Sequence, residues 1–198
     1  MSKSARNRAQ RSVLNQRQVP WGSIAFFTVI GLVAAVAIGY AFVQSRPSSA
    51  DSSIAGLIQK DDLAQGHTSS PVQYDTTPPM GGDHDPVWQN CDSRIYDRQL
   101  RNENAVHSLE HGAVWITYTP GLAADQIDKL KGKVENTDYT LMSPYPGQDA
   151  PVILTAWGKQ LKLQNASDAR VDAFLRAFVK GEQTPEPGAA CNGAKDAP

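Results

Sequence analysis

Hydrophobic positions are unevenly distributed along the chain, and their longest continuous run covers residues 22–43. This run contains no charged residue and no proline. About 20 apolar residues in a helix, at a rise of about 1.5 Å each, cross a bilayer core of about 30 Å. Trp21 and Tyr40 stand near its two ends, where amphipathic rings favour the membrane interface. The pattern therefore predicts a transmembrane helix over residues 22–43.

Basic residues gather on one side of this run and predict its orientation. Residues 1–21 carry a charge of +5 and no acidic residue, whereas only Arg46 follows the run closely. Positive charges favour the cytoplasmic side, so residues 1–21 are expected to be a cytoplasmic basic tail and the rest extracytoplasmic. The run is longer than the apolar part of a cleaved signal peptide and lacks a small-residue cleavage site. We therefore expect a single-pass protein of the cell membrane with an uncleaved signal anchor.

The polarity pattern after this run predicts one small domain. Residues 44–65 are expected to form a linker and stalk, with weak helical periodicity over 54–65. Residues 66–92 are rich in turn-forming residues and are expected to be mostly loop. The domain is expected to cover residues 66–193, with a short tail over 194–198.

The periodicity within the domain predicts an α+β fold with about four short strands and two to three helices. Apolar spacing predicts helices over residues 103–111, 122–132 and 167–180, the last one capped by Ser167. Runs of β-forming residues predict strands over residues 113–118, 138–142, 151–157 and 160–163. A hairpin turn is expected at Trp157-Gly158-Lys159.

Charge and cysteine content refine this picture. Beyond residue 21 the chain carries a charge of −6, which argues against nucleic acid as a partner. Both cysteines, Cys91 and Cys191, follow the apolar run, and in an oxidising compartment such a pair is expected to form a disulfide. The alternative is two unrelated thiols.

The histidines provide the one candidate site. His107 and His111 are separated by four positions, so on a helix they share a face and can bind one metal ion. His84 stands in the preceding loop, and Glu110 and Met80 are further candidate ligands. Imidazole suits zinc or copper, and a thioether would favour copper. The alternative is a set of hydrogen-bonded structural histidines, with His111 at the negative end of a helix dipole.

Residues 107–111 also match the H-x-x-E-H pattern of inverted zinc proteases, with Glu110 as the base. Such an enzyme needs a long helix and a further acidic ligand downstream. Here Gly112 ends the helix and a strand follows, so a zinc-dependent hydrolase is only a remote alternative. The sequence contains no G-x-S-x-G, no phosphate-binding glycine loop and no C-x-x-C.

Several segments together resemble the bacterial domain-of-unknown-function family 3105. They are residues 78–84, 88–91, 105–118, 141–146, 156–158 and 183–188, with Tyr96 and Cys191. The resemblance implies one N-terminal membrane helix and an outer domain, found mainly in actinobacteria, with no established activity. It places His84, His107, Glu110 and His111 at motif positions. Met80 stands where many members carry Thr or Ser, so a Met80 ligand is a hypothesis for this protein alone.

These observations predict a membrane-anchored, extracytoplasmic protein that binds copper or zinc through His84, His107 and His111. Glu110 would be a ligand or would orient one. The alternative is a metal-free accessory subunit that docks on a larger membrane complex.

Overall fold

The structure is a computed structural model that describes residues 21–44 and 54–198. The chain divides into two compact units, Met1–Arg46 and Pro47–Pro198, which are described separately. The predicted basic tail, apart from Trp21, and the linker residues 45–53 lie outside the described residues.

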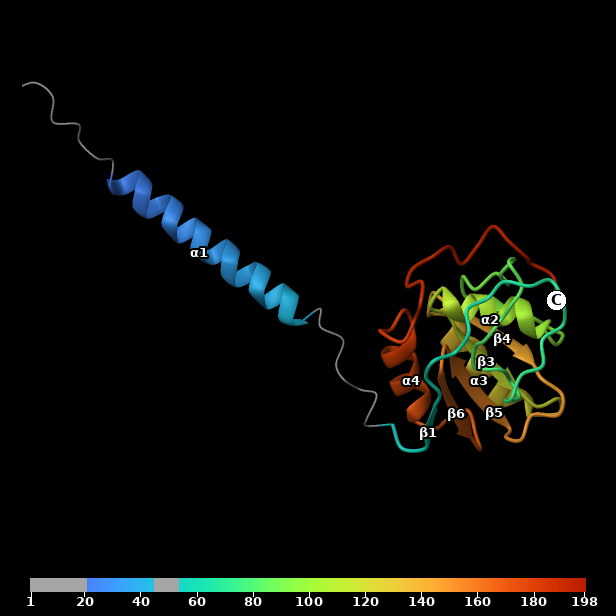
Figure 1. Cartoon of the computed structure of the whole chain (residues 1–198). Helices are drawn as coiled ribbons and strands as arrows, with labels where there is room; N and C mark the ends of the chain where they lie inside the picture. The colour runs from blue at the N-terminus through green and yellow to red at the C-terminus, as the bar shows by residue number, and fades with distance from the viewer. Residues whose placement is uncertain (1–20, 45–53) are drawn as a thin grey trace, which may run out of the picture. The chain divides into compact units, whose positions relative to one another are not determined.

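In the first unit, helix α1 covers Trp21–Gln44 and confirms that residues 22–43 are helical (Figure 1). The membrane assignment is wrong, however: no helix in the described parts of the chain combines the length and the apolar character that crossing a bilayer demands. The apolar, uncharged run over residues 22–43 and the aromatic residues near its ends were the basis of that prediction, and they indicate a helix without establishing a membrane span. The predicted single-pass topology and cell-membrane location are corrected accordingly.

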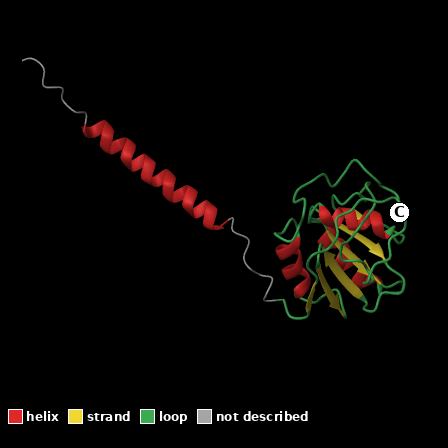
Figure 2. Ribbon diagram, in the orientation of Figure 1, coloured by secondary structure: helices red, strands yellow, loops and turns green. Residues whose placement is uncertain are grey.

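The second unit is built on a mixed sheet, whose strands are yellow in Figure 2. The sheet has six strands in the order β1-β6-β5-β3-β4-β2. The strands are β1 (Leu57–Gln59), β2 (Arg94–Ile95), β3 (Val114–Tyr118), β4 (Thr140–Pro144), β5 (Val152–Ala156) and β6 (Lys159–Leu163). β1, β6, β5 and β3 pair antiparallel, whereas β3, β4 and β2 pair parallel. The parallel pair β3–β4 requires a crossover, and helix α3 (Ala124–Glu135) provides it.

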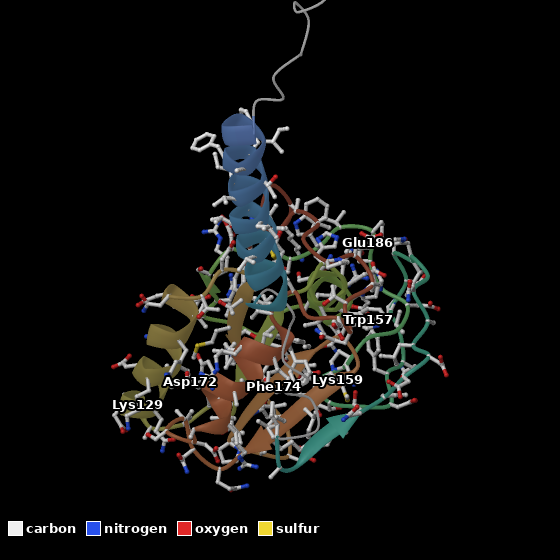
Figure 3. All side chains as sticks on the ribbon, turned by 90° about the vertical axis from the view of Figure 1, so that its left-hand side faces the viewer. Lys129, Trp157, Lys159, Asp172, Phe174 and Glu186 are labelled. Atoms are coloured by element: carbon white, nitrogen blue, oxygen red, sulfur yellow. A yellow bond between two sulfur atoms is a disulfide. The ribbon has the colours of Figure 1, made fainter. Side chains whose placement is uncertain are left out.

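Successive side chains along each strand point to opposite faces of the sheet, and the apolar ones form two separate hydrophobic clusters, one on each face. On β3, Ile116 belongs to one cluster and the neighbouring Trp115 to the other. The first cluster lies under α3 and α4 (Arg170–Phe178), whose fully buried Phe174 is labelled in Figure 3. The second lies under α2 (Asn102–Glu110), through residues such as Leu109. Within this unit the sheet is therefore covered on both faces, with α3 and α4 on one face and α2 on the other.

The fold differs from the sequence-based prediction in its strand count. The four predicted strands are present as β3 to β6, and the predicted hairpin joins β5 to β6. The sheet has two more strands than the expected four, because β1 and β2 have only three and two residues and show no sequence periodicity. β1 replaces the helix expected within 54–65, since it completes the edge beside β6. With α1, the described residues contain four helices.

Helix α4 begins later than its sequence pattern indicated. Ser167 does not cap it; the helix starts at Arg170, after Ala169. The carboxylate of Asp168 accepts hydrogen bonds from the main-chain N–H of Arg170 and from its guanidinium. These bonds lower the pKa of Asp168 to about 2.

The disulfide between Cys91 and Cys191 is present, as predicted, and links residues 100 positions apart. It fastens the C-terminal segment to the loop that precedes β2, where the N–H of Cys91 also donates to the carbonyl of Cys191 at 2.7 Å. Both cysteines belong to the cluster under α2.

Removing this disulfide is expected to destabilise the fold strongly. Cross-linking a loop of this length lowers the free energy of the native state relative to the unfolded chain by about 4–5 kcal/mol in a chain-entropy model. We expect Cys91→Ser with Cys191→Ser to lower the unfolding free energy by an amount of this order in urea titrations. Equal midpoints for the variant and the oxidised wild type would contradict this.

A glycine substitution in the β5–β6 turn tests the packing between this turn and its neighbours. Gly158 has a φ of +66°, and a Cβ there would lie 2.6 Å from the carbonyl oxygen of Lys60. Gly121 has a φ of +93° with open space around it. A non-glycine residue at positive φ costs about 1–3 kcal/mol, so Gly121→Ala should show that cost alone. Gly158→Ala should cost clearly more, as measured by thermal or urea unfolding.

Candidate metal centre

Helix α2 presents its apolar side to the sheet and its histidines to a covering loop. Ala105, Val106 and Leu109 belong to the cluster under the helix. His107 and Glu110 lie in the last turn and are nevertheless buried, with exposed fractions of 6% and 2%. The helix ends at Glu110, and Gly112 turns the chain just beyond it: its φ of +102° favours glycine, and its N–H donates to the carbonyl of Leu109. The burial of these polar side chains therefore comes from the loop and not from the sheet.

Residues 66–89 form that loop, and main-chain hydrogen bonds fix it to α2. The N–H groups of Asp85 and Gln89 donate to the carbonyls of Glu103 and Asn104. Within the loop, the Thr68 N–H donates to the carbonyl of His84. In the same parallel bridge the His84 N–H donates to the carbonyl of Gly66, so His67 and His84 lie side by side. Histidines 17 positions apart are thus brought over the same turn of α2.

His84 is the most deeply buried member of the group, with no solvent-exposed surface. Its Nδ1 lies 2.7 Å from the carbonyl oxygen of Gly82 and must donate, because a carbonyl only accepts. Its Nε2 lies 2.8 Å from Oε2 of Glu110. Despite this distance the contact lacks hydrogen-bond geometry, and neither atom has a hydrogen-bond partner among residues 21–44 and 54–198. In the neutral ring, therefore, the Nε2 lone pair lies beside a buried carboxylate oxygen without pointing at it.

His107 is oriented in the same way. Its Nδ1 donates to the carbonyl of Asp85 at 2.6 Å, which leaves Nε2 as the atom with a free lone pair. Burial lowers the pKa of His107 to about 4; the hydrogen bond to Asp85 opposes this shift, and the neighbouring histidines add to it. The ring is therefore neutral at neutral pH and able to act as a ligand.

His67 completes the group, although its sequence position did not mark it as a ligand. Its Nε2 lies 3.9 Å from Oε2 of Glu110, and its ring centroid lies 4.8 Å from that of His84 and 5.1 Å from that of His107. One ligand atom from each of His67, His84, His107 and Glu110 lies within 4.8 Å of every other. We call these four residues the histidine–glutamate cluster.

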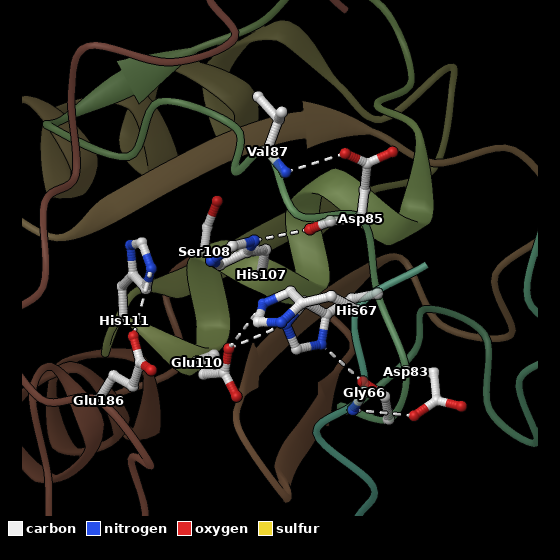
Figure 4. A network of polar contacts seen from close by, with 12 residues as sticks. Gly66, His67, Asp83, Asp85, Val87, His107, Ser108, Glu110, His111 and Glu186 are labelled. Carbon is white, nitrogen blue, oxygen red and sulfur yellow. Dashed lines mark hydrogen bonds and ion pairs between the residues drawn. The ribbon is translucent and has the colours of Figure 1, made fainter. Parts of the chain in front are cut away.

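Two of the predicted ligands stand outside this cluster. The Nδ1 of His111 donates to the carbonyl of Ala190 at 2.7 Å, and its Nε2 lies 3.8 Å from Glu186 (Figure 4). His111 stacks edge-on to His107 and so shares its helix face, but it fastens the C-terminal segment. Met80 is buried at 2% exposure, and its carbonyl accepts from the Gly158 N–H. A ligand role for either residue stays a prediction.

Charged side chains next to the cluster hold the loop in place. Arg101 donates to the carboxylate of Asp85 at 2.6 Å and to the carbonyl of Ser69 at 3.0 Å. Burial alone would raise the pKa of Asp85, but hydrogen bonds from Val87 and Arg101 hold it below its usual range. Glu103 accepts from the Val72 N–H and pairs with Arg101. The charged guanidinium thus links Ser69, two residues after His67, to Asp85, the residue after His84.

The cluster has the composition of a transition-metal site. Three imidazole nitrogens and one carboxylate oxygen form a donor set that zinc and copper accept. Bonds of about 2.0–2.2 Å in a tetrahedron put ligand atoms roughly 3.3 Å apart, and the Glu110 contacts of 2.8 and 3.9 Å lie on either side of that value. The indoles of Trp157 and Trp88 lie against His84 and His107 and reduce the access of water.

The lowered pKa of His107 makes the stability of the metal-free protein depend on pH. The unfolded chain takes up a proton near pH 6.5 and the folded chain only near pH 4. The unfolded state therefore binds more protons between these values, and the free energy of unfolding must fall as the pH is lowered through this window. Urea titrations from pH 7 to pH 4 should show this decrease, and His107→Gln should reduce it. A His107→Gln variant with an unchanged profile would contradict the assignment.

Comparison with known proteins gives a family but no function. The sequence profile described as protein of unknown function, DUF3105, matches residues 67–193, which is the larger part of the chain and includes the whole cluster. No curated protein and no solved structure matches the chain. The chain belongs to the DUF3105 family of proteins of unknown function.

Proposed function

We propose that this protein binds one divalent transition-metal ion, zinc or copper, through the histidine–glutamate cluster. The observation that carries this proposal is the contact between Nε2 of His84 and Oε2 of Glu110. The two atoms lie 2.8 Å apart, both are buried, and neither has a hydrogen-bond partner in the part of the chain that the structure describes. Two buried acceptor atoms side by side are destabilising unless a cation neutralises them. A metal ion bound by both atoms would do so, whereas a proton on Nε2 would not point at the carboxylate oxygen.

The charge and donor types of the cluster support a divalent ion. Three neutral imidazoles and one carboxylate carry a charge of −1, which a dication overcompensates by one unit. No sulfur belongs to the cluster, and imidazole with carboxylate is a better donor set for Zn²⁺ or Cu²⁺ than for Cu⁺. The carbonyls of Gly82 and Asp85 orient two of the rings, as hydrogen-bond acceptors behind metal-bound histidines commonly do.

The protease alternative receives less support. In the H-x-x-E-H pattern both histidines bind the ion and the glutamate is the base. Here Glu110 groups with His107, while His111 stands outside and binds the C-terminal segment. The three motif residues therefore divide: His107 and Glu110 belong to the candidate ligand set, and His111 makes a structural contact.

Metal binding by the full-length, oxidised chain is the direct test. We expect one Zn²⁺ or Cu²⁺ per chain, and a rise in unfolding free energy of about 2.7 kcal/mol when the free ion is at 100 times its Kd. His84→Gln, His107→Gln and Glu110→Gln should each abolish most of this gain. The measurements are metal content after gel filtration and melting temperature with and without the ion.

His111→Gln is the matched control, because it alters a buried histidine on the same helix face. It should lower the stability of the metal-free protein through the lost contact with Ala190 and leave the stoichiometry at one. Circular dichroism of each metal-free variant establishes that it is folded. If the wild type binds neither ion and shows no shift, the metal proposal is wrong and a metal-free interaction module is favoured instead.

A further inference from the structure

The four members of the histidine–glutamate cluster differ sharply in their access to solvent. The side chains of His84 and Glu110 are 0% and 3% exposed, whereas that of His67 is 47% exposed. His107 is 6% exposed as a residue. His84, His107 and Glu110 are therefore the three buried members of the cluster. His67 is the member that reaches the solvent.

The side chains also differ in how they are held. The rings of His84 and His107 are fixed by Nδ1–H bonds to main-chain carbonyls, and Glu110 lies on a helix. Among the residues that the structure describes, no hydrogen bond holds the His67 ring, and its nearest charged partner is Glu110 at 3.9 Å. The ring of His67 is therefore free to change rotamer.

The backbone under His67, in contrast, is firmly attached. Hydrogen bonds of 2.9 Å and 2.7 Å join Gly66 and Thr68 to the main chain of His84, and the Gly66 N–H donates to Asp83. Movement of His67 into or out of the cluster thus needs only a side-chain rotation, which takes picoseconds to nanoseconds for an exposed residue. The loop need not open.

We infer that His67 is the exchangeable ligand of the metal site, through which the ion enters, leaves and is passed to an incoming imidazole donor. This inference rests on the proposed metal binding. The exchange is a ligand substitution: one nitrogen–metal bond breaks, another nitrogen lone pair forms its replacement, and no electron is transferred. His84, His107 and Glu110 keep the ion in place while the fourth position changes partner.

Replacement of His67 and addition of free imidazole test this inference. The probe is whichever of Zn²⁺ and Cu²⁺ the full-length wild type binds more tightly. His67→Ala should still bind one ion per chain, with affinity reduced and release to a chelator accelerated by about ten-fold or more. Free imidazole should restore slow release and affinity in His67→Ala, because the vacated position opens to solvent.

His107→Ala is the matched control, since its vacated position is buried and should not be restored by imidazole. Circular dichroism of both metal-free variants shows whether they are folded. If the wild type binds no ion, the proposed function itself fails. If it binds, two results overturn only the exchange: His67→Ala with unchanged affinity and release, or His67→Ala that loses the ion and is not rescued.

Discussion

The loop of residues 66–89 is held against α2 by hydrogen bonds between polar groups that would otherwise be buried without partners. Histidine rings take part directly, because His84 donates to Gly82 within the loop and His107 donates to Asp85. The same bonds that fix the loop also decide which nitrogen of each ring keeps its lone pair. Since both Nδ1 atoms are used, both Nε2 atoms are left for the space beside Glu110. Buried polar atoms need hydrogen-bond partners. This one requirement explains why the loop covers α2, which nitrogen of each ring carries the proton, and why the Nε2 atoms are left beside Glu110.

The sequence predicted the parts of this arrangement that depend on local pattern. The spacing of His107, Glu110 and His111 placed them on one short helix, and the structure confirms α2 there. The spacing could not show that the two histidines diverge, because that depends on Ala190, which is distant in the sequence. His67 escaped detection for a similar reason: only its bridge to His84 brings it to Glu110. That all four histidines fall within residues 67–111 was the one available signal.

The fold divides in the same way between local and non-local causes. The strands of five residues carry enough alternating or continuous apolar pattern to be recognised. The two short edge strands exist only through their partners, β6 and β4, and a segment of two or three residues carries no period. The membrane prediction combined the length, apolar character and lack of charge of residues 22–43 with the aromatic and basic residues beside them. These properties correctly predicted a helix, but no helix among the described residues is long and apolar enough to cross a membrane.

The C-terminal segment bears on where a shorter version of this domain could end. The match to the family stops at residue 193, yet the side-chain amide of Gln89 donates to the carbonyls of Lys195 and Ala197. The main-chain N–H of Asn90 also donates to the carbonyl of Lys195. Ending the polypeptide at residue 193 would remove the acceptors of the Gln89 side-chain amide and of the Asn90 main-chain N–H, which are both buried residues. A domain boundary chosen from sequence similarity alone would thus remove the residues that hydrogen-bond to Gln89 and Asn90.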